Sequence, residues 1–375
     1  MRPFIIIRGG GDLATGVAQK FVRSGFRVLI LETQEPTAIR RGVSLSEAVY
    51  DDEARVEDML ALQIYDPEEL ESFWQVQPPA LPLKRRPLPR SPYPVPDPPC
   101  YALPPERPYR IPVLVDPAGD LISDLKPLAV IDATMSKTPV NEPWWRSRYI
   151  APITIGLGPG FTAGGDVDAV IETMRGHDLG RIIFQGSARE DTGVPGEVGG
   201  KSAQRVLYAP VSGLLGPVHD LGDRVEEGEC IFEMYPCDTN PYLPDSGVRS
   251  VMPILLREPV LVTAPFTGIL RGLIRTEIWI PKGLKCVDID PRLDTPYDTI
   301  SDKARALGGA ALEAFLYLLE NRMLLSMSDA ISSPGIEKEI GPDRWQAKFR
   351  GRINDPKTLK RSTFPLAEPW NPDLW

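Results

Sequence analysis

The sequence predicts an α/β protein in which a Rossmann-like parallel sheet is followed by a β-rich, barrel-like region and a terminal helix. Three observations support this prediction. Residues 4–32 have the pattern of a strand, a glycine-rich turn, a helix and a second strand. Strand-like apolar runs then alternate with helical pieces through residue 155, which is typical of a parallel sheet. Residues 206–295 are rich in strand-forming sequence and contain an internal repeat.

The first glycine-rich turn has the pattern of a dinucleotide-binding loop. Gly9, Gly11 and Ala14 match G-x-G-x-x-G/A, in which the glycines permit a tight turn and close approach of a pyrophosphate. The helix that follows would direct free N–H groups and a positive dipole end at the phosphates. A purely structural turn is the alternative interpretation. The residues predicted to bind a cofactor are Gly9, Gly10, Gly11, Asp12, Leu13, Ala14, Glu32 and Arg40.

An acid and two arginines after this turn indicate whether the bound ribose would carry a free 2′-hydroxyl or a 2′-phosphate. Glu32 lies 21 residues after Gly11, where the acid that binds a ribose hydroxyl is expected. It favours a free 2′-hydroxyl over a 2′-phosphate. Arg40 and Arg41 follow closely and would suit a phosphate instead, so NAD and NADP both stay open.

The predicted nucleotide-binding domain covers residues 1–165 and contains a proline-rich insertion at residues 78–110. Thirteen of those 33 residues are proline, which fixes φ and removes N–H donors. Strand-like runs resume at residues 111–116 and 129–134. We therefore expect the insertion to hang from the sheet as an extended or disordered loop rather than to separate two domains.

A second glycine-rich stretch follows the strand-like run that ends near residue 155. Its glycines and polar groups favour an anion-binding nest at a strand end. The alternative is a β-hairpin of residues 167–173 with 180–185, within a connection that spans residues 166–205. The second candidate site comprises Gly156, Gly158, Gly160, Phe161, Thr162, Glu172, Arg175, His177, Ser301 and Lys303.

Residues 206–295 form the predicted β-barrel-like domain, and they contain a repeated motif. Ala-Pro-Val-Ser-Gly-Leu-Leu at residues 209–215 recurs as Ala-Pro-Phe-Thr-Gly-Ile-Leu at residues 264–270. The pattern resembles the quasi-twofold barrel of biotinyl and lipoyl carrier domains, in which a lysine lies on the hairpin between the halves. No lysine occurs from Cys230 to Val262, so a swinging-arm carrier is excluded and a docking or structural module is expected.

The end of the chain is predicted to be a helix and a tail. A helix within residues 296–325 is capped by Ser301 or Thr299, and its small residues permit close packing back on the core. Residues 326–375 are rich in proline, charge and tryptophan, and we expect an irregular tail there.

Composition narrows the classes of partner. A net charge of −9 and a pI near 5.1 argue against nucleic acid as the main partner. No apolar run is long enough for a membrane span and no signal peptide is recognised, so a cytoplasmic protein is expected. Four cysteines without a C-x-x-C pair and two histidines favour reduced structural thiols and no metal site.

Five stretches, in order, resemble one known family. They are Ile7-Arg-Gly-Gly-Gly-Asp-Leu-Ala, Pro36-Thr-Ala-Ile-Arg-Arg, Gly156-Leu-Gly-Pro-Gly-Phe-Thr-Ala-Gly, Ile171-Glu-Thr-Met-Arg-Gly-His and Thr299-Ile-Ser-Asp-Lys-Ala-Arg-Ala. The chain is similar here to the YqeB-type family, whose members are named selenium-dependent molybdenum hydroxylase system proteins. The resemblance covers about residues 4–77 and 111–320. It implies an accessory role for molybdenum hydroxylases of the xanthine dehydrogenase type and a predicted NAD(P)-binding region, but no catalytic residue.

Three functions follow as hypotheses. The first is a maturation factor that binds NAD(P) or the dinucleotide form of the molybdenum cofactor, with a hydroxylase as client. The second is an NAD(P)-dependent oxidoreductase on a small substrate, with His177, Lys303 or Glu172 as acid–base. The third is a non-catalytic scaffold that docks a client through its barrel-like domain. The catalytic residues and the oligomeric state stay open.

Overall fold

A computed structural model describes residues 3–75, 108–135, 148–191, 200–242, 251–276 and 278–331. Residues 3–315 form one compact unit, and a second unit begins at Leu316. Most of the predicted insertion and tail lies outside the described residues. The insertion nevertheless ends earlier than predicted, because Tyr109 and Arg110 already belong to a strand.

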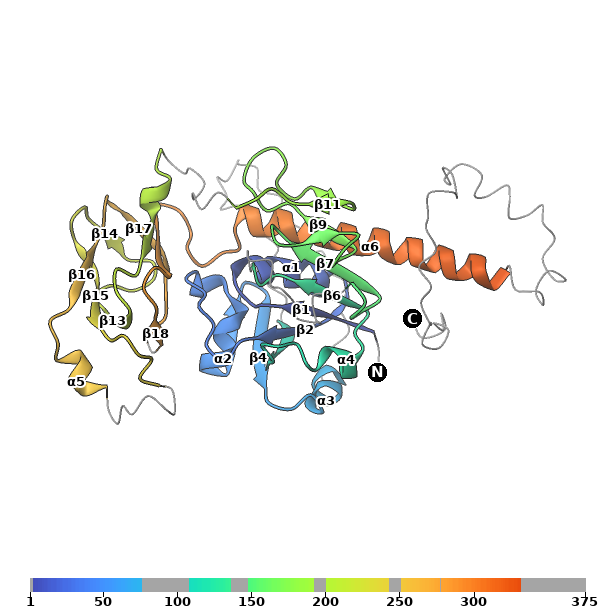
Figure 1. The fold of residues 1–375 in the computed structure, drawn as a ribbon, viewed down its shortest axis with the longest axis horizontal. Coiled ribbons are helices and arrows are strands. Elements are labelled where there is room, and N and C mark those ends of the chain that lie inside the picture. Colours follow the sequence, from blue (N-terminus) through green and yellow to red (C-terminus); the bar gives the residue numbers. More distant parts are fainter. Residues whose placement is uncertain are drawn as a thin grey trace, which may run out of the picture. The chain divides into compact units, whose positions relative to one another are not determined.

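A nine-stranded sheet organises the first half of the chain, and Figure 1 shows its central strands. Its order is β10-β9-β7-β6-β1-β2-β5-β4-β3. Strands β5-β2-β1-β6-β7-β9 are all parallel to their neighbours and follow the order 3-2-1-4-5-6 of doubly wound dinucleotide-binding sheets. Strand β4 extends the sheet in parallel, while β3 and β10 close its two ends in antiparallel pairings.

The sheet strands are short, and the central ones are buried. Ile5, Ile6 and Ile7 of the first strand are all 0% exposed, as expected for a parallel sheet covered on both faces. The bounds are β1 (Phe4–Arg8), β2 (Arg27–Glu32), β3 (Glu53–Val56), β4 (Met59–Ile64), β5 (Tyr109–Val115), β6 (Ala129–Asp132), β7 (Ile153–Leu157), β9 (Ala169–Ile171) and β10 (Ile182–Ile183). A separate two-stranded pair joins β8 (Thr162–Ala163) to β11 (Gly186–Ser187).

Helix α1 (Asp12–Arg23) follows the first strand, as the glycine-rich pattern predicts. Its apolar stripe is buried on the sheet, with Val17 and Phe21 at 0% exposure. It ends at Gly25, whose φ of 89° allows the left-handed cap that closes the last turn. The shorter helical pieces of this region are η1 (Arg41–Val43), η2 (Leu45–Glu47), α2 (Ala48–Asp51), α3 (Glu69–Gln75) and α4 (Ile122–Leu125).

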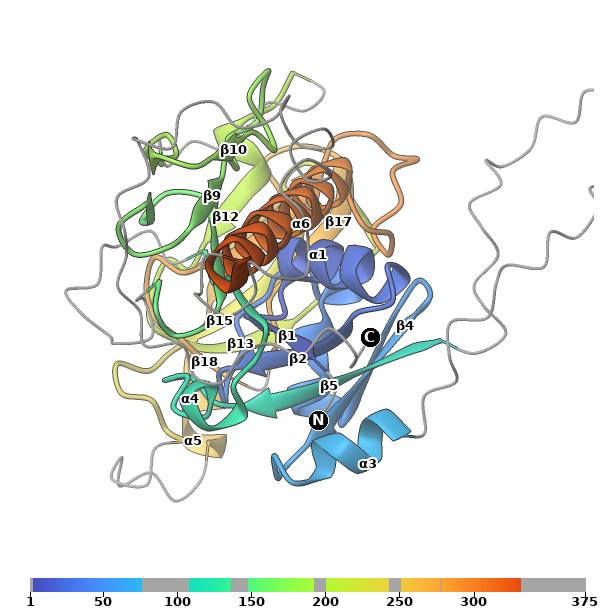
Figure 2. The ribbon, with the colours of Figure 1, turned by 90° about the vertical axis from the view of Figure 1, so that its right-hand side faces the viewer.

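Helix α6 (Asp302–Ile331) lies against α1, as Figure 2 shows. The helices meet through glycine: a Cβ added at Gly16 would lie 2.4 Å from the Ala304 carbonyl oxygen, and one added at Gly308 would lie 2.3 Å from that of Gly16. Ser301 Oγ accepts a hydrogen bond from the Ala304 N–H and so caps the helix. The helix runs to Ile331, past the end at residue 325 that the sequence predicts.

The β-rich region is a sandwich of two four-stranded antiparallel sheets. Their orders are β12-β19-β17-β14 and β16-β15-β13-β18, and one apolar core joins residues of both. The bounds are β12 (Val206–Tyr208), β13 (Gly213–Pro217), β14 (Arg224–Val225), β15 (Cys230–Pro236), β16 (Val260–Thr263), β17 (Gly268–Leu273), β18 (Trp279–Ile280) and β19 (Lys285–Asp290), with η4 (Ala203–Arg205) before them and α5 (Met252–Leu255) between β15 and β16.

The predicted barrel-like region is therefore confirmed only in part: it is a β structure of two sheets, and it does not close into a barrel within the described residues. The strands β14 and β18 have only two residues each, so they end one edge of each sheet without pairing across to the other within the described residues. The repeat itself has a structural counterpart. Each repeat, β12–β15 and β16–β19, divides its strands between the two sheets. In each sheet the two outer strands come from one repeat and the two inner strands from the other.

Among the described residues, no helix combines the length and the apolar character that a membrane crossing requires.

Candidate functional site

The three glycines after β1 differ in what lies beside them. Gly9 has a φ of 85°, and a Cβ there would lie 3.3 Å from the backbone of Thr134. A Cβ on Gly10 would lie 2.9 Å from the Ser46 backbone nitrogen, and that N–H donates a 2.9 Å hydrogen bond to the Gly10 carbonyl. A Cβ on Gly11 would meet nothing within 4 Å. Only the third glycine thus borders open space.

The start of α1 borders the same open space. Gly11 is the N-cap residue, and no side chain caps the first turn. The first N–H groups of a helix have no partner within the helix, and together with the macrodipole they favour an anion. The helix has twelve residues, so its dipole is that of a full helix. The chemistry available at this point is the binding of a phosphate.

Glu32 is fully engaged by backbone groups. It is 8% exposed, and its Oε1 accepts a 2.5 Å hydrogen bond from the Gly10 N–H. Its Oε2 accepts a 2.7 Å hydrogen bond from the Thr33 N–H. Burial raises the pKa of Glu32, and the backbone hydrogen bonds from Thr33 and Gly10 oppose that shift. Here the acid fixes the glycine-rich turn to the end of β2, which accounts for it without a ribose.

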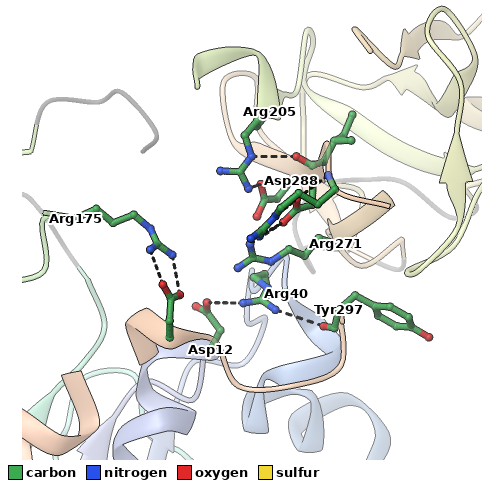
Figure 3. A network of polar contacts seen from close by, with 11 residues as sticks. Asp12, Arg40, Arg175, Arg205, Arg271, Asp288 and Tyr297 are labelled. Carbon is green, nitrogen blue, oxygen red and sulfur yellow. Dashed lines mark hydrogen bonds and ion pairs between the residues drawn. The ribbon is translucent and has the colours of Figure 1, made fainter. Parts of the chain in front are cut away.

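Arg40 reaches the first turn of α1 from the connection after β2. It is 6% exposed, and its Nη1 lies 3.7 Å from Oδ2 of Asp12 (Figure 3). Its Nη2 donates to the Tyr297 carbonyl at 3.4 Å, whereas Nε and Nη1 have no hydrogen-bond partner among the residues that the structure describes. Burial lowers the pKa of Arg40, and so does the charge of Arg271. Such an arginine is available for an anion beside the helix start.

The sandwich contributes further charges to this neighbourhood (Figure 3). Arg271 of β17 pairs with Asp290 at 3.3 Å, and its buried Nε has no hydrogen-bond partner within the described part of the chain. Arg205 pairs with Asp288 at 3.0 Å. We call these groups the arginine cluster, which comprises Arg40, Arg175, Arg205, Arg271, Lys285 and Arg292 with Asp12, Asp288, Asp290 and Asp302.

The segment between β2 and β3 joins the glycine-rich turn to the sandwich. The Leu273 N–H donates to the Ile39 carbonyl at 2.8 Å. Arg41 donates from Nε to the Leu273 carbonyl at 2.8 Å, so it anchors the segment rather than facing the helix start. Arg275 binds Glu47 at 2.9 Å and stacks 4.5 Å from the Tyr50 ring. The position of Arg40 is therefore fixed from both sides.

The second glycine-rich stretch is filled by its own side chains. A Cβ on Gly156 would lie 2.4 Å from the Phe161 ring, which is 2% exposed within an apolar cluster. A Cβ on Gly158 would lie 2.7 Å from Oγ1 of Thr173. Gly160 has a φ of 96°, which suits the turn. Packing and turn geometry account for these glycines without a ligand.

The remaining residues of the second candidate site have separate environments. Thr162 is exposed and bonds Asp166 through its backbone, and the buried Glu172 accepts from the N–H groups of Met174 and Arg189. His177 is exposed, Ser301 caps α6 and Lys303 is half-buried.

Arg175 is the member of that group that joins the first site. Its two guanidinium nitrogens bind the Asp302 carboxylate at 2.9 and 3.1 Å, which holds the pKa of Asp302 at about 2. Asp302 also experiences the charge of Arg271. The two sets of predicted residues thus converge partly on one place.

Sequence reasoning missed the sandwich half of the cluster. The signal that was present is Asp288-Ile-Asp-Pro-Arg292, whose two aspartates alternate along β19 and so share one face. Burial raises the pKa of Asp290, but hydrogen bonds from Arg292 and Arg271 outweigh it and hold the pKa at about 2. The pattern gave no indication of which partner this face meets.

A buried ion pair occupies the point where the strand order reverses. Arg8 ends β1, is 4% exposed and binds Asp132 of β6 at 3.2 Å. It also donates to the Pro117 carbonyl at 2.8 Å, and Asp132 accepts from the Thr134 hydroxyl at 2.6 Å. Ligands of doubly wound sheets bind outside the strand ends at this point, so these residues border the candidate site. Within the described ranges, no three His, Cys, Asp or Glu side chains gather as metal ligands.

Comparison with curated proteins gives one clear relative. The chain is 37% identical over 316 residues to a protein of Escherichia coli K12 described as uncharacterized protein YqeB. The match covers 84% of this chain and 48% of the relative, so the chain spans about half the length of the relative. No protein-family model matches the chain.

Solved structures give only faint likenesses. An aspartoacylase family protein from Mesorhizobium loti is 13% identical over 24% of each chain, with a TM-score of 0.19. A succinylglutamate desuccinylase from Silicibacter is 19% identical over 37% of this chain and 45% of that chain, also with a TM-score of 0.19. Likenesses at this level assign neither fold nor activity to this chain.

Proposed function

Because the chain belongs to the YqeB-type family, we propose that it is an accessory protein that binds a dinucleotide through the N-terminal end of α1. The ligand is NAD(P) or the dinucleotide form of the molybdenum cofactor, since both present a pyrophosphate. Strand order 3-2-1-4-5-6 and the glycine-rich turn support this proposal.

One observation carries the proposal. Beside the uncapped start of α1, Gly11 borders open space, and Arg40 is 6% exposed with two nitrogens that lack hydrogen-bond partners. A buried guanidinium in that state loses hydration without full compensation. An anion at the helix start would supply the missing acceptors.

The binding chemistry needs no catalytic group. Pyrophosphate oxygens accept hydrogen bonds from the first-turn N–H groups, and the positive dipole end stabilises their charge. Arg40 moves its contact from the Asp12 carboxylate to a phosphate, a charge-assisted hydrogen bond of the stronger kind. The ligand is thereby held at the carboxyl ends of the strands.

The client we propose is a molybdenum hydroxylase of the xanthine dehydrogenase type. This part of the proposal rests on the family resemblance. Restoring hydroxylase activity in cells that lack the chain tests it, with wild-type chain and a binding-deficient variant compared. Equal restoration by both would separate the accessory role from dinucleotide binding.

The direct test is calorimetric titration of the full chain with inorganic pyrophosphate, NAD and NADP. Gly11→Asp places a carboxylate where the phosphate would lie, while aspartate is itself a good N-cap, so folding should be kept. We expect affinity to fall by more than tenfold. Ser123→Asp adds the same charge on exposed α4 and serves as the matched control. Equal affinity in both variants, or no binding by wild type, would refute the site.

A docking scaffold is the second candidate, and one observation favours it. Leu256 and Leu261, near α5 and on β16, are 80% and 57% exposed, at the place where related carrier topologies display a lysine. Capture of a purified hydroxylase by wild type but not by Leu261→Glu would support docking there. For the oxidoreductase hypothesis, the carboxylate of Glu172 is already bound to two backbone N–H groups, which leaves His177 and Lys303 as its candidate acid–base residues.

A further inference from the structure

We propose that the ligand at the start of α1 extends toward the sandwich rather than along β2, and that it carries a second anionic group there. Lys285 and Arg271 would bind that second group. This inference rests on the proposed function and adds the direction and charge of the ligand.

The path along β2 is closed by backbone contacts. Both carboxylate oxygens of Glu32 accept hydrogen bonds from backbone N–H groups and the residue is 8% exposed, so the acid presents little surface to a ribose. The Ser46 N–H lies on the Gly10 carbonyl, and the Leu45 N–H donates to Oγ1 of Thr15 in α1 at 3.1 Å. A ribose in its usual place would have to displace these contacts.

The path toward the sandwich leads to cations. Arg40 bridges from the first turn of α1 to the Tyr297 carbonyl, and Arg271 has a buried Nε without a hydrogen-bond partner. Lys285 begins β19 and is solvent-exposed, and its side chain makes no ion pair or hydrogen bond within the described residues. Lys285 lies on the strand that also carries Asp288 and Asp290, and Asp290 is the partner of Arg271. Desolvation lowers the pKa of Lys285, and the charges of Asp288 and Asp12 oppose that shift.

The charges of the arginine cluster favour an anionic ligand. It contains six cationic and four acidic side chains, although the whole chain has a net charge of −9. A local positive excess in an acidic protein attracts negatively charged ligands. A single phosphate at the helix start would leave a positive excess on the sandwich side, where Asp288 and Asp290 are the acidic groups of the cluster beside Arg205, Arg271, Lys285 and Arg292. A ligand with two separated anionic groups, such as a dinucleotide with an additional phosphate, matches both.

NAD and NADP are the sharpest pair of probes, because they differ by one phosphate. If the second anion meets the sandwich, wild-type chain should bind NADP about tenfold more tightly than NAD, a difference of about 1.4 kcal/mol. Lys285→Gln should reduce that ratio to near one, whereas the exposed Lys282→Gln on the same sandwich should preserve it. Both changes remove one surface charge, so folding is matched.

Glu32→Gln distinguishes the proposed direction of the ligand from an arrangement in which Glu32 faces the ribose. In an arrangement where Glu32 faces the ribose, the acid repels a 2′-phosphate, and Glu32→Gln would raise the NADP-to-NAD affinity ratio. We expect the ratio to stay unchanged instead, because Glu32 faces the Gly10 and Thr33 N–H groups.

The failures of the two proposals are distinguishable. Pyrophosphate and NAD could bind in a Gly11-dependent way while Lys285→Gln leaves the ratio of NADP to NAD affinity unchanged. In that case the site at the start of α1 stands and the direction proposed for the ligand is wrong. If neither pyrophosphate nor either dinucleotide binds, the proposed function and this inference are both overturned.

Discussion

The glycine-rich turns after β1 and after β7 differ in what lies beside their glycines. At the first turn, Gly11 borders open space at the start of a twelve-residue helix. At the second, the Phe161 ring fills the side of Gly156, and Thr173 fills that of Gly158. At the second turn, the missing Cβ atoms make room for neighbouring side chains of the protein, whereas at the first turn Gly11 leaves space that a ligand can occupy. A glycine-rich strand end thus indicates a binding site only when the missing Cβ is not replaced by a neighbour.

Gly156→Ala should give the largest effect. The new Cβ would lie 2.4 Å from the buried Phe161 ring, and displacing that ring would open the apolar cluster around it. We expect a loss of about 3 kcal/mol in the free energy of unfolding, at the upper end for overpacking. Thermal and urea denaturation measure it. Gly11→Asp is the control, since it should stay within about 0.5 kcal/mol of wild type while losing ligand. Equal stability of the two variants would contradict the comparison.

Arg40→Met tests whether the arginine beside the first turn binds an anion. Loss of a charge-assisted contact to phosphate should weaken pyrophosphate binding roughly 50-fold, or about 2.3 kcal/mol. Arg181→Met is the matched change outside the arginine cluster. The Arg181 side chain is 62% exposed and pairs with Asp178, so we expect less than about a twofold effect on binding. Titration calorimetry of both variants decides, and a larger effect at Arg181 would contradict the assignment of the anion to the first turn.

The stability of the segment beside Gly10, which contains Ser46 and Glu47, should depend on pH. Burial raises the pKa of Glu47 to about 6, against the opposing charge of Arg275. A raised carboxyl pKa means that the folded chain favours the protonated form. The resulting stability is complete below the unfolded pKa near 4.5 and is lost as pH rises through 6. Its size is at most about 2 kcal/mol, from 1.36 kcal/mol per pKa unit.

Glu47→Gln tests this titration. Melting temperatures of wild type and variant, measured between pH 4.5 and 7.5, should converge at the acid end and differ most near neutrality, where the ionised Glu47 is unfavourable. Arg275 keeps its second partner, Asp51, in the variant. A constant difference across the range would show that Glu47 does not titrate there.

Patterns within short stretches of the sequence predicted the secondary structure of those stretches well. The strand, turn and helix signals of residues 4–32 correspond to β1, α1 and β2 within two residues at each end, because hydrophobic period and glycine position fix them. The repeat at residues 209–215 and 264–270 likewise has its counterpart in the exchanged strands of the sandwich. The barrel-like region was confirmed only in part, because the two sheets do not close into a barrel within the described residues and closure depends on strand lengths that the motif does not encode.

The site was predictable only in part, because half of it comes from distant sequence. Arg40 meets the Tyr297 carbonyl across 257 positions, and no local pattern specifies such a contact. Glu32 shows the other limit. Its spacing from Gly11 predicts a ribose ligand, but only the fold reveals that the Gly10 and Thr33 N–H groups take both of its oxygens. Whether the predicted residues bind a ligand stays a prediction.

Two adjacent glycines of α6 allow the same comparison, between a glycine beside a neighbour and a glycine beside open space, within a helix. A Cβ on Gly309 would meet nothing within 4 Å, whereas one on Gly308 would lie 2.3 Å from the Gly16 carbonyl oxygen of α1. Gly309→Ala should therefore stabilise the chain by about 0.5 to 1 kcal/mol, because alanine restricts the unfolded chain and favours the helix. Gly308→Ala receives the same propensity gain, but the contact with α1 should turn it into a net loss. Melting temperatures of the two variants measure the packing term alone, since the helix and the substitution are the same.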